Sequence, residues 1–495
     1  MERGRKTWQW CAGGGAILLF VVLLAIRLEI PAKFRSGGGE TIAPVHAGPP
    51  AGETWMSITQ GGGKIGYAQR IYEDIPDGFR FSEHIFMKIN TMGITQPLTV
   101  RTLAELKPDR TLSNFRFDLS SNLFKFTAGG SVSGKNLTVR IGSPGEERIS
   151  VIPLQNRPFL GGAILESAVA DGLAIGEERS FPVFDPASLG QRTARVILLG
   201  EEPIMIMGKS RTARKLSVDF MGMKQTAWIG PDGSVLREEG IMGIALERVA
   251  KGVALAGLEG AVSADLTELA AVPSSKPIAD AEALNFLEIR LDGLRNHHFA
   301  LDGGRQHYRN GVLTVRRESR DGAPVRKSIP AKELMASLEP TALIQSDNPK
   351  VRQKVAEIVL KGDSSEVMAK KMVTWIHDNL EKRPVLSVPN ALETLQNRIG
   401  DCNEHAVLLA AFARAAGIPA EVEAGVVYMR GRFYYHAWNI LYLRERGGWV
   451  TADAVLGQIP ADVTHIRFVR GESEHQLDLV GLIGQLKIDI LETGR

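Results

Sequence analysis

The feature that most constrains the fold is a change of pattern partway along the chain. From residue 54 to residue 270, short runs of β-forming residues follow one another between turn signals. After residue 340, apolar residues recur at helical spacing instead. A chain of 495 residues is also too long for one core. We therefore predict a multidomain protein with a β-rich antiparallel sandwich or sheet domain over 54–270, a mixed connector over 271–340 and a different domain over 341–495.

The N-terminus contains an uncharged run of 19 residues, WQWCAGGGAILLFVVLLAI, at positions 8–26. About 20 apolar residues span a bilayer as a helix. A cleaved signal peptide is the alternative, but no A-x-A-like cleavage site follows closely. The run predicts an uncleaved, single-pass anchor over 1–35 in the inner (cytoplasmic) membrane, with an exported, periplasmic body. The Gly/Pro-rich residues 36–53 then read as a flexible linker.

The net charge argues against nucleic-acid binding. It is only +3 for the whole chain, and no basic stripe with interleaved aromatic residues is present. Nucleic acid is therefore not an expected partner.

Two helices are predicted at the start of the C-terminal domain. The first covers 346–362, with Asp347 as its cap and a proline in its first turn. The second covers 363–384, with Asp363 as its cap, and ends at a proline.

Cysteine use singles out Cys402. The chain has two cysteines, and Cys11 lies within the predicted anchor, so a disulfide inside the body is excluded. Asp401 and Glu404 have the spacing of a capping box, and residues 406–413 are all apolar. Cys402 is therefore expected in the first turn of a buried helix.

That position favours a reactive role for Cys402 over a purely structural one. The N-terminus of a helix carries partial positive charge and free N–H groups, which favour a thiolate and can hold an oxyanion. A structural cysteine is the alternative, but it would sit more naturally in the apolar middle of the helix.

A nucleophilic cysteine needs a base and a residue that orients the base. His405 shares a helix face with Cys402, but it has no third member and is expected to pack or cap. His436 lies in the β-forming run GRFYYHAWNILYL, and Asp453 lies on the returning strand WVTADA. Side chains alternate between the two faces of a strand, and residues that face each other across a hairpin point to the same side. His436 and Asp453 therefore share a face only if the numbers of facing residues add up to an odd value, as when Leu443 faces Gly448. We predict such an even loop, or a bulge.

Residues 391–458 resemble the core of the transglutaminase-like superfamily. The landmarks are GDC at a helix start, RAAGIPA at its end, YYHAWN on one strand and WVTADA on the next. With the predicted anchor, the chain looks like a bacterial membrane-anchored transglutaminase-like domain protein. The resemblance implies a papain-like α+β fold and a catalytic triad of Cys402, His436 and Asp453.

The resemblance also implies a mechanism. The thiolate of Cys402 would attack an amide carbonyl and form a thioester, which water hydrolyses or an amine accepts. The N–H of Cys402 would stabilise the oxyanion, with Gln396 or Asn397 as a side-chain donor. No calcium-loop motif is present, so we predict no metal and no cofactor.

The predicted function is a membrane-anchored cysteine protease, amidohydrolase or acyltransferase acting on protein or peptide amides. Hydrolysis is slightly favoured because water is always available. The alternative is a non-catalytic, membrane-tethered interaction scaffold. In either case the β-rich domain could hold a partner protein.

Overall fold

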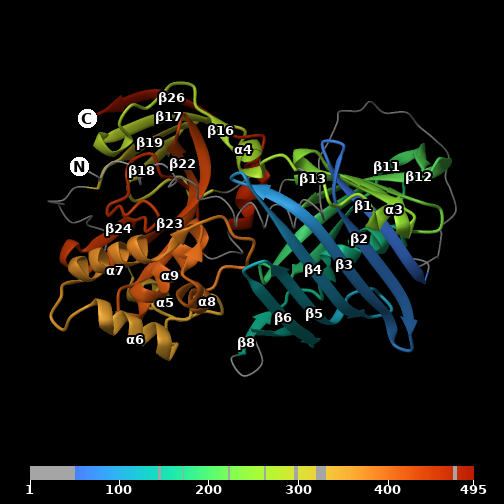
Figure 1. Cartoon of the computed structure of the whole chain (residues 1–495), viewed down its shortest axis with the longest axis horizontal. Coiled ribbons are helices and arrows are strands. Elements are labelled where there is room, and N and C mark those ends of the chain that lie inside the picture. Colours follow the sequence, from blue (N-terminus) through green and yellow to red (C-terminus); the bar gives the residue numbers. More distant parts are fainter. Residues whose placement is uncertain are drawn as a thin grey trace. The chain divides into compact units, whose positions relative to one another are not determined.

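A computed structural model describes residues 51–142, 147–170, 172–220, 223–260, 263–294, 299–318, 330–471 and 476–495. The chain divides into two compact units, with the boundary between Leu266 and Thr267 (Figure 1). The two units are described separately below. The domain boundaries given by the sequence pattern stay predictions.

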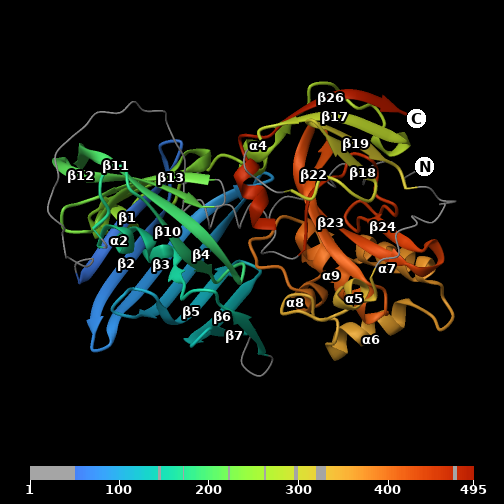
Figure 2. The same ribbon diagram turned by 180° about the vertical axis from the view of Figure 1, so that it is seen from behind.

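The N-terminal unit is built on one 15-stranded sheet. Its strand order is β8-β7-β6-β5-β4-β3-β2-β1-β15-β14-β13-β12-β11-β10-β9, and the pairs are antiparallel except β9 with β10. Figures 1 and 2 show β2 to β6 side by side. The strands are β1 (Gly52–Gln60), β2 (Gly63–Ile75), β3 (Gly78–Thr91), β4 (Ile94–Leu106), β5 (Leu112–Ser121), β6 (Lys125–Ser133), β7 (Asn136–Ile141), β8 (Arg148–Pro153), β9 (Phe159–Leu160), β10 (Glu178–Asp185), β11 (Gly190–Ile206), β12 (Lys209–Phe220), β13 (Met223–Ile229), β14 (Val235–Glu239) and β15 (Ile244–Val249).

Short helical segments complete this unit. They are η1 (Gly161–Ala163), α2 (Ile164–Ala170), η2 (Ile241–Gly243) and α3 (Lys251–Leu255).

Alternating burial along the strands explains why this half of the chain forms a sheet. In β3, every second residue from Phe81 to Thr91 is buried, and Phe81, Ile85, Met87 and Ile89 form the apolar part of this row. The residues that alternate with them are only partly buried. Burying a large apolar side chain contributes about 1.5–3 kcal/mol, so a repeat of period two holds one face of the sheet on a core. The β-rich antiparallel prediction is confirmed in the form of one sheet, because β1 pairs with β15 and joins the two runs of strands.

The buried face of this sheet also contains a charged cluster. Arg70 of β2 bonds to the facing Glu83 of β3 at 2.9 Å and to Glu238 of β14 at 2.6 Å. Gln225 of β13 donates to the second oxygen of Glu238 at 2.8 Å. All four side chains are buried, so the cluster is shielded from water.

The C-terminal unit combines helices with two main antiparallel sheets and a short parallel pair, β20 with β21. In both views its helices α6 to α9 gather at one end, β22 and β23 lie beside them, and β17 and β26 lie at the other end (Figures 1 and 2). Its elements are α4 (Leu266–Ala270), β16 (Val272–Pro273), η3 (Ala281–Ala283), β17 (Phe286–Asp292), β18 (Gln306–Arg309), β19 (Val312–Arg316), α5 (Ala331–Ala336), α6 (Pro349–Ile358), α7 (Ser365–Asn379), β20 (Glu381–Lys382), α8 (Ala391–Asn397), β21 (Ile399–Gly400), α9 (Cys402–Ala415), β22 (Ala420–Met429), β23 (Arg432–Leu443), η4 (Arg444–Arg446), β24 (Gly448–Ala452), β25 (Ile466–Arg470), η5 (Leu477–Leu482) and β26 (Lys487–Gly494).

The two predicted helices at the start of the C-terminal domain are present, but each cap lies one residue later than predicted. Each helix also ends earlier than predicted, α6 at Ile358 and α7 at Asn379. Asn348 caps α6 and Ser364 caps α7, in place of Asp347 and Asp363. Each capping side chain accepts an N–H of the first turn, which satisfies a donor that has no partner within the helix.

The segment predicted to be a mixed connector belongs to this unit. Its strands β17, β18 and β19 form a four-stranded sheet with β26, the last strand of the chain. Its Arg305 donates to the carbonyls of Ala461 and His465, at 2.6 and 3.0 Å. The segment therefore helps to hold the loop that follows β24.

The predicted architecture beginning with a transmembrane helix is corrected. Among the residues that the structure describes, none of the helices is both long enough and apolar enough to span a bilayer. The longer helices α7 and α9 have 15 and 14 residues, short of the roughly 20 that a bilayer requires, and both bury a face in the C-terminal unit. Residues 8–26 and most of the predicted linker lie outside the described residues. The same correction applies to the predicted inner-membrane location and periplasmic body, which depend on that anchor.

Candidate active site

Cys402 begins helix α9, as the sequence predicts. Asp401 is the cap: its side chain accepts the N–H of Asn403 at 3.0 Å, while Glu404 accepts the N–H of Asp401 at 3.0 Å. Gly400 is sterically required, since a Cβ there would lie 2.3 Å from the Cβ of Glu404. The G-D-C sequence therefore fixes the start of the helix, and with it the position of the thiol.

The thiol is buried and surrounded by both donors and acids. Cys402 is fully buried, and its sulfur receives the backbone N–H of Ala437 and lies 3.5 Å from Nδ2 of Asn403. Burial raises the pKa of the thiol well above its usual range, and the nearby Asp401 carboxylate raises it further. The expectation that the helix N-terminus lowers this pKa is therefore wrong, because burial and carboxylates outweigh the dipole. The resting cysteine is a neutral thiol.

The β23–β24 hairpin has the register that the triad demands. Leu443 faces Gly448, and the pairing continues to Asn439 facing Ala452, which places His436 and Asp453 on one face. Nε2 of His436 lies 2.7 Å from Oδ2 of Asp453. The prediction of an even loop is confirmed.

The hydrogen bond to Asp453 sets the tautomer of His436. A carboxylate accepts only, so Nε2 carries the proton and Nδ1 keeps its lone pair. Nδ1 is buried and has no hydrogen-bond partner among the described residues. The Cys402 sulfur bonds to the N–H of Ala437, the next residue along β23, so it lies beside the strand that carries His436.

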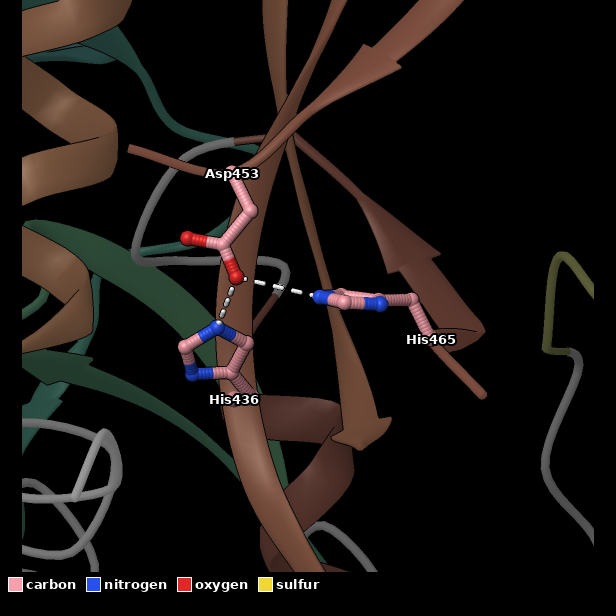
Figure 3. Close-up of side chains that lie close together, drawn as sticks. All are labelled: His436, Asp453 and His465. Carbon is pink, nitrogen blue, oxygen red and sulfur yellow. Dashed lines mark hydrogen bonds and ion pairs between the residues drawn. The ribbon is translucent and has the colours of Figure 1, made fainter. Parts of the chain in front are cut away.

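Asp453 accepts four hydrogen bonds. Its Oδ1 receives the N–H groups of Val455 and Leu456 at 2.7 and 3.1 Å, and its Oδ2 receives His436 and His465, the latter at 3.0 Å (Figure 3). Burial alone would raise the pKa of Asp453, but the hydrogen bonds from His436 and His465 and the positive charge of His465 hold it well below its usual range. Asp453 is therefore a fixed carboxylate.

His436, Asp453 and His465 place three ligand-type atoms within 4.8 Å of one another, a spacing that would also suit a metal ion. Both Nε2 atoms, however, lie at hydrogen-bonding distance from the same carboxylate oxygen. A nitrogen that donates its proton in this way has no lone pair for a metal. We describe the three as a hydrogen-bonded cluster, and the absence of a metal stays a prediction.

The remaining candidates lie elsewhere. Gln396 and Asn397 are exposed at the end of α8, and their role as oxyanion donors stays a prediction. His405 is buried, with Nδ1 2.6 Å from the carbonyl of Asp401. Burial lowers its pKa to about 4, so it is a neutral packing residue, as the sequence predicts.

Sequence reasoning missed His465 and its partner Asp462, which lie in the loop between β24 and β25. Nδ1 of His465 is 3.3 Å from Oδ1 of Asp462. The D-x-x-H spacing was a signal that the two interact, but only the path of the loop brings them to Asp453. Asn403, beside the sulfur, was also missed.

Comparisons with known proteins agree with this geometry. The family model of the transglutaminase-like superfamily matches residues 352–454. A search of curated proteins gave no match. Solved structures gave distant likenesses: a proposed cysteine protease from Cytophaga hutchinsonii (17% identity, 42% of this chain and 86% of that one, TM-score 0.27) and a β-barrel-like protein from Brucella abortus (11% identity, 40% and 95%, TM-score 0.31).

A proposed protease from Parabacteroides distasonis is 13% identical, over 58% of this chain and 66% of that one, with a TM-score of 0.21. At TM-scores this low the likenesses carry no argument about this chain. The family model does, because its match contains the helix of Cys402 and the hairpin of His436 and Asp453. Residues 352–454 of this chain form a domain of the transglutaminase-like superfamily.

Proposed function

We propose that this protein is a cysteine enzyme that cleaves or transfers the acyl group of protein or peptide amides. One observation carries the proposal. His436 is oriented by Asp453 at 2.7 Å, and its unpartnered Nδ1 is buried beside the strand residue that bonds to the Cys402 sulfur. A nucleophile, a base and a residue orienting that base are the parts that covalent acyl transfer requires.

The reaction would run through a thioester. The sulfur of Cys402 attacks the amide carbon while its proton passes to Nδ1 of His436. His436 then gives that proton to the leaving amine as the C–N bond breaks. Water, or a second amine, next gives a proton to His436 and attacks the thioester, which releases the acyl product and restores the thiol.

The electrostatics favour a neutral resting pair over an ion pair. Because burial and the Asp401 carboxylate raise the pKa of the Cys402 thiol, the proton would move during attack and not before it. The N–H groups in the first turn of α9 lie where the oxyanion forms and have no acceptors within the helix. Hydrolysis is the simpler outcome, because it needs no site for an acceptor amine.

A non-catalytic interaction protein is the second candidate, and one observation favours it: Cys402 is 0% exposed and its thiol is neutral. The catalytic proposal requires a substrate to reach this thiol, whereas a structural cysteine would stay closed.

Alkylation by iodoacetamide separates the two candidates. Peptide mapping by mass spectrometry follows Cys402 in the full chain, in wild type, His436→Ala and Asp453→Asn, and hydrogen exchange verifies that each variant is folded. We expect alkylation to slow by at least about 10-fold in His436→Ala and by less in Asp453→Asn. His307→Gln, a change at an exposed histidine of β18, is the matched control. Equal, slow labelling in all four proteins would overturn the catalytic proposal.

A further inference from the structure

Behind Asp453 lies a second acid–histidine pair. His465 is fully buried, with Nε2 3.0 Å from Oδ2 of Asp453 and Nδ1 3.3 Å from both Oδ1 and the carbonyl oxygen of Asp462. Every one of these partners accepts hydrogen bonds and none can donate. An imidazole that faces acceptors at both nitrogens needs a proton on each, so the geometry describes an imidazolium.

The charge balance around His465 supports this state. Burial alone would lower its pKa, but the carboxylates of Asp462 and Asp453 raise it to about 9. Burial alone would raise the pKa of Asp462, but the charge of His465 and hydrogen bonds from His465 and Thr464 hold it well below its usual range. Both carboxylates are therefore ionised and His465 is positive at neutral pH.

Other packed elements add few charges to this site. The segment before β18 contributes Arg305, which donates to the His465 carbonyl and pairs with Glu318. Trp438 of β23 packs edge-on against the His465 ring at 5.1 Å and donates to Glu423 of β22. Arg467 of β25 pairs with Glu423, and the ring centroid of His436 is 5.7 Å from that of His465. Two more charged groups interact electrostatically with the site: Lys382 of β20 with Asp453, and Asp401 with His436.

We propose that His465, held by Asp462, is a positioning residue of the site, which fixes the carboxylate of Asp453 and offsets part of its charge at His436. This inference rests on the proposed function. Charges alternate from Asp462 through His465 to Asp453, so the positive His465 reduces the field that Asp453 exerts on His436. Both residues of the second pair lie beyond the matched residues 352–454, so the match does not assign them a role.

The consequence is a base that is held in one orientation. Because His465 fixes Oδ2 of Asp453, the 2.7 Å hydrogen bond from Nε2 of His436 leaves Nδ1 available to accept the thiol proton. In the proposed reaction Asp453 and His465 keep their protonation states, and only His436 exchanges a proton.

Histidine-selective ¹⁵N labelling and NMR of the full chain test this directly. In wild type we expect His465 to carry protons on both nitrogens at pH 7 and to lose one near pH 9. In His465→Gln, the proton on Nε2 of His436 should exchange with water at least about 10-fold faster, because Asp453 is no longer held in place to accept it. Asp462→Asn should lower the pH at which His465 loses its proton. The matched control is again His307→Gln.

A neutral His465 at pH 7 in wild type would overturn the inference, and this measurement needs no variant to fold. An unchanged exchange rate of the His436 Nε2 proton in a folded His465→Gln would also overturn it. Neither readout uses a substrate or the thiol. If Cys402 alkylation did not depend on His436, the proposed function alone would be rejected. If alkylation did depend on His436 but the exchange rate were unchanged, only the inference would be rejected.

Discussion

Each unit of the molecule buries a charged cluster around one central group, and the two clusters have opposite designs. In the β-rich unit a central cation, Arg70, is shared by two carboxylates, Glu83 and Glu238. In the C-terminal unit a central anion, Asp453, is shared by two histidines. Both clusters are shielded from water, so burial of charge alone does not distinguish them.

What distinguishes them is which group can exchange a proton. Arginine keeps its proton in proteins, so the first cluster titrates through acids. They are Glu238 and the buried Glu166 of α2, which interacts electrostatically with Arg70. Histidines exchange protons near neutral pH, and those of the second cluster lie beside a thiol. The comparison indicates that the first cluster fixes strand pairing, whereas the second can move a proton.

The largest expected effect is on the first cluster. Arg70→Ala should lower the free energy of unfolding of the β-rich unit by about 3–5 kcal/mol, because Glu83 and Glu238 are left buried without a cation. Hydrogen exchange read by mass spectrometry measures this unit separately from the other. Arg116→Ala, at an exposed ion pair of β5, is the control and should change the same quantity by less than about 1 kcal/mol. A loss as small as the control's would mean that the cluster does not fix the strands.

The next effect is a pH dependence of the β-rich unit. Burial raises the pKa of Glu166 from 4.5 to about 7, so its protonated form stabilises the fold. That stability is complete below pH 4.5 and is lost as the pH rises to about 7, by about 3 kcal/mol. Glu166→Gln should flatten the curve between these values, measured by hydrogen exchange, whereas Glu178→Gln, an exposed change on β10, should not. An unchanged slope in Glu166→Gln would assign the titration to another acid.

Local chemistry explains which parts of the structure could be predicted from sequence. The capping box at Asp401 and Glu404 depends on residues three apart, and the register of Leu443 and Gly448 depends on one short loop. These rules placed Cys402, His436 and Asp453 correctly relative to their own elements.

Features set by long-range packing could not be predicted in this way. His465 reaches Asp453 because β25 approaches β22 closely at Gly425, where a Cβ would lie 1.9 Å from the carbonyl oxygen of Ile466. No local pattern shows that approach. The same holds for the raised pKa of Cys402, which depends on full burial, and for the pairing of β1 with β15 that makes one sheet.

The second cluster should also give a pH dependence, in a different window. The raised pKa of His465 means that its contribution to stability is complete below pH 6.5 and is lost as the pH rises to about 9. The loss should be about 3 kcal/mol in the C-terminal unit and should disappear in His465→Gln. Hydrogen exchange at pH 6 and pH 9, corrected for intrinsic rates, measures it. If both units lost stability in the same window, the contrast between an acid-titrating and a histidine-titrating cluster would fail.

The smallest expected effect concerns the support of the second cluster. Arg305 donates to the carbonyls of Ala461 and His465 and pairs with Glu318, a forked geometry that lysine cannot reproduce. Arg305→Lys should therefore cost the C-terminal unit about 1 kcal/mol and speed hydrogen exchange in the loop between β24 and β25. Arg290→Lys, an exposed change on β17, is the control.

Because Arg305→Lys keeps the positive charge, the pH window of His465 should stay where it is in wild type. That result would show that Asp453 and Asp462 set the charge of the cluster, while Arg305 only holds the loop in place. A displaced window would contradict this division of roles. It would mean that the second cluster depends on the four-stranded sheet for its proton chemistry as well as for its position.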